Sequence, residues 1–94
     1  MKLFISADIE GCVGTTLASE THKETPEYRQ FAKRMTDEVR IVCQAALEAG
    51  AGEIVVKDGH GDATNIDFTA MPEGVTLIRG KSGRVYGALM SMLT

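Results

Sequence analysis

Two short apolar runs on either side of one long amphipathic segment constrain the fold more than any other feature of this chain. Residues 3–7 (Leu-Phe-Ile-Ser-Ala) and 53–57 (Glu-Ile-Val-Val-Lys) are typical of strands, the first of them buried on both faces. The segment between them predicts a helix that starts with Thr25 as N-cap and Pro26 at its first position and ends before Gly50. A strand, a helix and a strand within about 55 residues predict a right-handed βαβ unit with parallel, adjacent strands.

The rest of the chain extends this unit. Residues 75–79 predict a third strand and residues 85–93 a second helix, whereas Ile66, Phe68 and Met71 are expected to anchor the connection before the third strand to the core. We therefore expect an α/β fold with a three-layer core around a parallel sheet. The long helix is expected to pack on the sheet through the apolar side chains that recur at steps of three and four, namely Tyr28, Phe31, Met35, Val39, Val42, Ala46 and Ala49.

Composition excludes several classes of function. The net charge is -3 and the Lys and Arg residues are scattered, which argues against a nucleic-acid partner. No stretch approaches the roughly 18–20 apolar residues of a membrane helix, and the apolar start reaches Asp8 too early for a signal peptide, so a cytoplasmic protein is expected. The two cysteines, Cys12 and Cys43, lack a C-x-x-C spacing and are expected to be reduced thiols.

Polar side chains follow both strands of the βαβ unit. Asp8 and Glu10 end the first strand, and in an extended segment residues two apart point the same way. Asp58 and His60 end the second strand, and the carboxyl ends of adjacent parallel strands meet at the edge where α/β sheets bind ligands. Two carboxylates and an imidazole suit zinc, manganese or similar ions, with Asp8 able to bridge two of them.

Each of these residues also has a plainer interpretation. Asp-Gly and Glu-Gly pairs are common in turns, and Asp58 either orients His60 or caps its turn. The glycine-containing turn at 11–16 lacks the ending of a phosphate-binding loop. His22, in a polar loop at residues 17–25 that is expected to lie over the site, is more simply a solvated side chain, and Cys12 a small packed or half-exposed thiol.

The motifs, taken together, resemble the amino-terminal part of the DppA-like D-aminopeptidases, a family of zinc peptidases that assemble into ring-shaped homodecamers. The similarity extends from Met1 to about Gly80, and residues 81–94 match only loosely. It rests on two turns, D-x-E-G-x-x-G and D-G-H-G, at the spacing of the family. The matching residues are 6–14, Tyr28, 35–39, 46–51, 55–61, Asn65 and Ile66.

The resemblance implies that Asp8, Glu10 and His60 are zinc ligands, with Asp8 bridging two ions per subunit, and that the substrates are short peptides with an amino-terminal D-residue. Family members are much longer, and their further His ligand, further carboxylate ligand and catalytic His lie in parts absent here. Residues 1–94 are therefore expected to be the amino-terminal part of a single metallopeptidase domain. The catalytic His is expected beyond Thr94, so no catalytic residue is expected in these residues, and they are expected to be inactive without the rest.

Two other functions stay open from the residues alone. One is a non-catalytic α/β interaction module whose acidic edge binds a divalent cation or only stabilises turns. The other is a Mg²⁺-dependent phosphohydrolase, which an Asp at a strand end and a second carboxylate would suffice to build. His60 argues against magnesium, which prefers oxygen ligands.

Overall fold

The computed structural model describes residues 1–12 and 14–80. Within these two ranges, three strands, one long α-helix and three single-turn 3₁₀ helices follow one another. They are β1 (Lys2–Ala7), η1 (Ile9–Gly11), η2 (Ala18–Glu20), α1 (Tyr28–Glu48), β2 (Glu53–Asp58), η3 (Phe68–Ala70) and β3 (Val75–Ile78).

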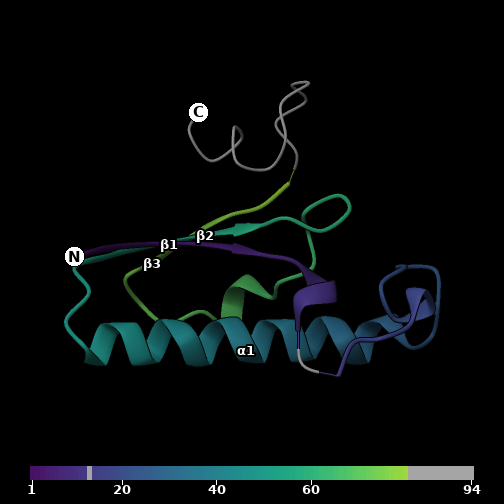
Figure 1. The fold of residues 1–94 in the computed structure, drawn as a ribbon. Helices are drawn as coiled ribbons and strands as arrows, with labels where there is room; N and C mark the ends of the chain where they lie inside the picture. The colour runs from purple at the N-terminus through teal and green to yellow at the C-terminus, as the bar shows by residue number, and fades with distance from the viewer. Residues whose placement is uncertain (13, 81–94) are drawn as a thin grey trace.

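The three strands form one parallel sheet in the order β1-β2-β3. β1 and β2 are adjacent and in register from Lys2 opposite Glu53 to Ala7 opposite Asp58. α1 connects them and runs along one side of the sheet (Figure 1). The predicted βαβ unit is therefore confirmed, and the carboxyl ends of β1 and β2 lie side by side.

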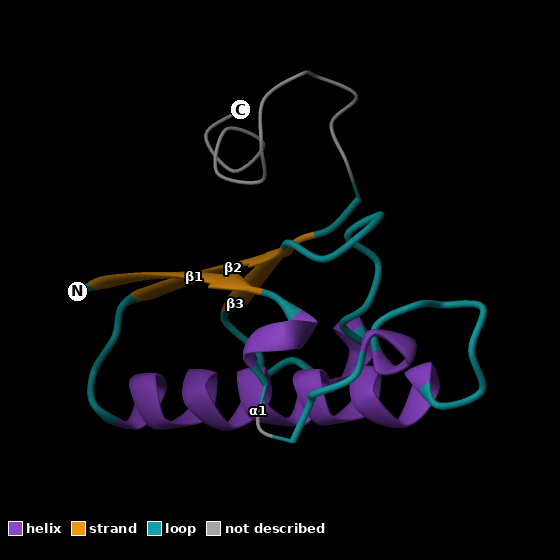
Figure 2. Cartoon of the chain, turned by 45° about the vertical axis from the view of Figure 1, so that its right-hand side comes forward, coloured by secondary structure: helices purple, strands orange, loops and turns teal. Residues whose placement is uncertain are grey.

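The described residues form two layers, the sheet and α1 (Figure 2). Two predictions fall outside these residues: the helix at residues 85–93, and the catalytic His that is expected beyond Thr94. Two layers of the expected core are present in the described residues, and the third layer stays a prediction.

The expectation that the first strand is buried on both faces is wrong, because Phe4 is 44% exposed. Side chains of a strand alternate between the two faces of the sheet. Leu3 and Ile5 pack against the core with α1, whereas Lys2, Phe4 and Ser6 point the other way and are exposed.

The core lies between the sheet and α1. Its helix side contains Met35, Val39 and Cys43, as the step of three and four predicts, but Val42 is 49% exposed. Val42 was expected on the packed face and lies beside it, because the neighbouring Cys43 occupies the central position with no exposed surface. The sheet side contributes Ala7, Ile54 and Val56, and Ile9 and Ile66 close the end nearest the polar edge.

The helix begins later than predicted. Thr25 is not its N-cap, since the Thr25 hydroxyl donates to the carbonyl oxygens of Ser19 and His22. The carbonyl of Thr25 accepts from the N–H of Tyr28, so residues 25–28 form a turn before α1. The end is as predicted: Gly50 adopts a φ of 95°, which favours glycine and ends the helix.

The connection from β2 to β3 is anchored at Ile66, which is buried, and at Met71, which packs against the core. Phe68 was expected to anchor it too, but it is 58% exposed and lies beneath the guanidinium of Arg79, 5.3 Å from the ring centre. This cation–π contact stabilises the ring at the surface. Among residues 1–12 and 14–80, no helix has the length and apolar character needed to cross a membrane.

Candidate metal centre

The candidate centre lies at the carboxyl edge of the sheet, where β1 and β2 end opposite each other. The N–H of Gly59 donates to the carbonyl of Ala7 at 2.8 Å, which extends the pairing one residue beyond the strands. A Cβ at position 59 would lie 3.0 Å from that oxygen, so the close approach requires glycine. Asp8 and His60 follow directly, and the edge brings them together as predicted.

Three side chains from the two strand ends converge there. His60 Nδ1 lies 3.1 Å from Asp8 Oδ1 and 3.0 Å from Glu10 Oε1. One ligand atom from each of the three residues lies within 4.8 Å of the others. The side chains of Asp8 and Glu10 are 56% and 61% exposed, whereas that of His60 is 17% exposed. The carboxylates thus face solvent, where an ion can reach them, and the imidazole lies behind them.

The route by which Glu10 reaches this point differs from the prediction. The sequence suggested that Asp8 and Glu10 extend the strand and point the same way. In the structure only Asp8 is extended, and Ile9–Gly11 form the single turn η1, with the N–H of Gly11 donating to the carbonyl of Asp8. Burial of Ile9, which has no exposed surface, fixes this turn. The two carboxylates meet because the chain bends, not because it stays extended.

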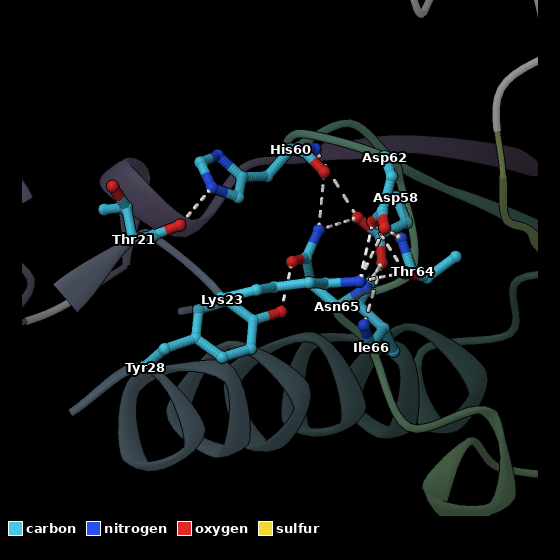
Figure 3. Close-up of polar contacts among 9 residues, drawn as sticks. All are labelled: Thr21, Lys23, Tyr28, Asp58, His60, Asp62, Thr64, Asn65 and Ile66. Atoms are coloured by element: carbon cyan, nitrogen blue, oxygen red, sulfur yellow. Dashed lines mark hydrogen bonds and ion pairs between the residues drawn. The ribbon is translucent and has the colours of Figure 1, made fainter. Parts of the chain in front are cut away.

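Both ring nitrogens of His60 face oxygen atoms. Nε2 lies 2.6 Å from the carbonyl oxygen of Thr21, which can only accept, so Nε2 must carry the hydrogen (Figure 3). In a neutral ring Nδ1 would then turn a lone pair toward the carboxylates of Asp8 and Glu10. That arrangement is repulsive unless a proton or a metal cation lies at Nδ1. Metal-binding histidines commonly donate their second N–H to a backbone carbonyl, and the contact with Thr21 has this form.

The contacts within the cluster also change the pKa of Asp8. Partial burial acts to raise this pKa, but contacts with the Glu10 side chain and backbone and the nearby His60 outweigh it, so the pKa lies below its ordinary value. Asp8 is therefore ionised at neutral pH and available as a ligand.

A cavity of about 500 Å³ opens beside the cluster. Glu10 and His60 form part of its wall, and the remaining lining comes from the loop that precedes α1. The loop at 17–25 was expected to lie over the site; it lies beside it and lines this cavity, and it leaves the carboxylates of Asp8 and Glu10 exposed. The loop residues that line the cavity are Thr15, Thr16, Leu17, Ala18, Thr21 and His22.

The other predicted candidates do not join the cluster. His22 is exposed at the wall of the cavity, and Asp58 is fully buried and points away from the imidazole ring toward Asn65 and Ile66. Asp58 therefore caps its turn, one of the two roles that the sequence left open. Burial, together with a hydrogen bond to Glu38, raises the pKa of Cys12 to about 12, so this thiol is not a nucleophile at neutral pH.

Sequence reasoning missed two groups that hold His60, the carbonyl of Thr21 and the side chain of Asn65. A backbone carbonyl has no sequence signal. The sequence predicts no role for Asn65 beyond its match to the family, although an Asn seven residues after an Asp at a strand end can bond back to it, as Asn65 does to Asp58 at 2.9 Å.

Comparison with known proteins shows to which family this chain belongs. The profile of the peptidase M55 family, described as D-aminopeptidase, matches residues 1–93. The chain belongs to this family. No curated protein sequence matches it significantly.

A solved structure of a D-aminopeptidase shares the fold. It is the zinc-dependent D-aminopeptidase DppA from Bacillus subtilis, described as a self-compartmentalizing protease, with a TM-score of 0.83 and 27% sequence identity. The similarity covers 87% of this chain but only 30% of DppA. The sequence-based expectations of an α/β fold and of this family are thus confirmed, and the chain corresponds to less than a third of that enzyme.

Proposed function

We propose that this chain is the zinc-binding part of an aminopeptidase that releases amino-terminal D-residues from short peptides, and that Asp8, Glu10 and His60 are its zinc ligands. The observation that carries the proposal is the convergence of these three side chains, within 4.8 Å, at the sheet edge of a chain that belongs to the D-aminopeptidase family. DppA, which shares the fold, is zinc-dependent.

The donor set fits zinc better than magnesium. An imidazole nitrogen and two carboxylates are ordinary zinc ligands, whereas Mg²⁺ prefers oxygen ligands throughout. The Nε2–H of His60 is engaged by Thr21, which leaves Nδ1 as the ligand atom and fixes its direction. This argues against a Mg²⁺-dependent phosphohydrolase.

Within this proposal the residues of the chain have distinct roles. When bound, zinc lowers the pKa of a coordinated water and polarises the peptide carbonyl. Asp8, Glu10 and His60 would hold the metal, and the two carboxylates would supply the negative charge that offsets it, with Asp8 shared between the two ions proposed per subunit. The cavity beside Glu10 and His60 accepts the amino-terminal end of the peptide.

The proposal assigns the remaining machinery to the rest of the enzyme. DppA is more than three times as long as the region that matches, and we place two further ligands and the catalytic His in the corresponding remainder, beyond Thr94. The 94 residues are then expected to bind metal without hydrolysing peptides. Because DppA is self-compartmentalizing, we also propose that the complete protein assembles into a homo-oligomeric ring, a decamer.

Metal analysis of histidine variants tests the zinc site. After dialysis against zinc and then buffer, we expect His60→Ala to retain less zinc than the unaltered chain. Loss of a residue that only hydrogen-bonds to a metal ligand lowers metal affinity by roughly 10–100-fold, and loss of the ligand His60 should lower it by more. His22→Ala is the matched control, since it removes an imidazole at the same cavity that lies outside the ligand cluster. Equal zinc content in the unaltered chain and His60→Ala would refute the site.

Peptide hydrolysis separates the enzyme from a non-catalytic metal-binding module. A longer protein containing this chain should release D-alanine from a D-alanyl peptide in a zinc-dependent reaction. Zinc binding without such release by the complete protein would favour the module.

A further inference from the structure

Asn65 connects the metal centre to the interior of the protein. Its side-chain amide donates to the carboxylate of Asp58 at 2.9 Å and to the carbonyl of His60 at 2.6 Å, and its oxygen accepts from the hydroxyl of Tyr28 (Figure 3). Asn65 is 8% exposed; its bond to Asp58 is buried, and its bonds to His60 and Tyr28 are partly buried. Both N–H groups and the oxygen of the Asn65 amide therefore have partners. These three bonds connect Asn65 to α1, to the end of β2 and to the backbone of His60.

Asp58 fixes Asn65 in turn. One oxygen of this fully buried carboxylate accepts from the backbone N–H of Asn65 at 2.6 Å and of Ile66 at 2.7 Å. The other accepts from the Asn65 side chain, and also from the N–H of His60 at a long 3.5 Å. Asp58 thus closes the loop from 58 to 66 on itself and holds the Asn65 amide in one orientation.

Tyr28 fixes the same orientation from the other side. Burial and the carboxylates of Asp58 and Asp62 raise the pKa of Tyr28 to about 12, so its phenol stays protonated and donates. The amide oxygen of Asn65 accepts from this hydroxyl, and its NH₂ group faces two acceptors, the carboxylate of Asp58 and the carbonyl of His60. A flipped amide would set its oxygen against both of these acceptor oxygens.

The conformation of the segment that contains His60 depends on such hydrogen bonds. Residues 59–64 contain no helix or strand, and Gly61 and Ala63 adopt positive φ values of 56° and 62°. A non-glycine residue in this conformation persists only where its surroundings enforce it. The Asn65–His60 bond spans this turn and reaches the same carbonyl as the N–H of Ala63, which donates to it at 2.8 Å. Asn65 therefore restrains the backbone of His60 from outside the turn, and with it the direction of Nδ1.

We propose that Asn65 is a positioning residue of the metal centre, which holds the backbone of His60 so that its imidazole meets the carboxylates of Asp8 and Glu10. Asn65 touches neither the metal nor the substrate and acts through His60. The predicted effect of Asn65 on zinc affinity rests on the proposed function, whereas its effect on the position of the His60 imidazole does not.

The test compares Asn65→Ala with Val39→Ala in the full chain. Val39 is buried in the core on α1, so its truncation lowers stability without touching the loop. We expect Asn65→Ala to weaken zinc binding by about 10–100-fold, measured by isothermal titration calorimetry, and Val39→Ala to leave it unchanged. Tyr28→Phe is a second variant, which removes only the hydroxyl that donates to Asn65 and keeps the aromatic ring of residue 28. It is expected to weaken zinc binding less than tenfold.

Long-range ¹H–¹⁵N spectra of the imidazole provide a readout that needs no metal. In the metal-free chain, the spectra should show His60 with a hydrogen on Nε2. The ring nitrogen signals of His60 should shift in Asn65→Ala and stay in place in Val39→Ala. A spectrum of His22→Ala identifies which signals belong to His60. Unchanged signals and affinity in Asn65→Ala, or equal losses in Asn65→Ala and Val39→Ala, would overturn the inference. An unaltered chain that binds no zinc but shows the predicted signals would refute the proposed function alone.

Discussion

Truncation of the buried carboxylate at Asp58 gives the strongest prediction about stability. Asp58→Ala removes the acceptor of two short backbone hydrogen bonds, from Asn65 and Ile66, and of the Asn65 side chain. The carboxylate has no exposed surface, so solvent does not weaken these bonds in the folded state. The donors that remain are left without a partner in the interior.

The magnitude follows from these bonds. A hydrogen bond to a charged group contributes about 1.5–3 kcal/mol, so the two backbone bonds together amount to about 3–6 kcal/mol. The contact from the N–H of His60, at 3.5 Å, is too long to add much. At about 0.05–0.15 kcal/mol per residue, 94 residues correspond to a free energy of unfolding of about 5–14 kcal/mol, so Asp58→Ala should remove a large part of it.

Urea denaturation followed by circular dichroism at 222 nm measures this loss. With a slope of about 1–2 kcal/mol per molar urea, a loss of 3 kcal/mol lowers the midpoint by about 1.5–3 M. Asp67→Ala is the matched control, because Asp67 also accepts from a backbone N–H and a side chain, both of Thr69, but is exposed. We expect a much smaller shift for Asp67→Ala. Equal shifts in the two variants would show that burial of the Asp58 carboxylate does not determine its contribution.

Two further predictions concern the sheet edge and the loop beside it. Gly59→Ala should lower the urea midpoint and weaken zinc binding, because its Cβ would lie 3.0 Å from the carbonyl of Ala7, whereas Gly11→Ala, with no atom within 4 Å, should change neither. The hydrogen bond from Lys23 is the main cause that lowers the pKa of Asp62 to about 2. This pair therefore stabilises the fold above about pH 4 and loses its effect as the pH falls toward 2. In Lys23→Met a ¹³C titration should place the pKa of Asp62 closer to 3.8, and an unchanged pKa would contradict the assignment.

Local patterns in the sequence were sufficient for the βαβ unit. Apolar runs and helical periodicity depend on residues close in the chain, and the parallel pairing of β1 with β2 follows from the length of the connection between them. This topology also predicted that Asp8, Glu10 and His60 meet. The prediction had an extended path through Ile9, whereas in the structure the chain turns there.

The errors have a common cause. Thr25 was assigned as the helix cap because its type suits that position, yet its hydroxyl bonds to the loop at Ser19 and His22. Phe4 and Phe68 were assigned to the interior because they are apolar, yet they are 44% and 58% exposed. Side-chain type gives a tendency, and contacts with distant segments decide which tendency prevails.

By itself, the sequence determined that the chain is α/β, that two strand ends bring carboxylates and an imidazole to one edge, and that its motifs resemble those of the D-aminopeptidases. Only the tertiary structure decided how the imidazole is oriented. Its Nδ1 meets Asp8 across 52 residues, its Nε2 meets the carbonyl of Thr21 across 39, and the tie from Tyr28 to Asn65 spans 37. Such contacts depend on the packing of α1 and its preceding loop against the sheet edge, and no pattern of neighbouring residues encodes them.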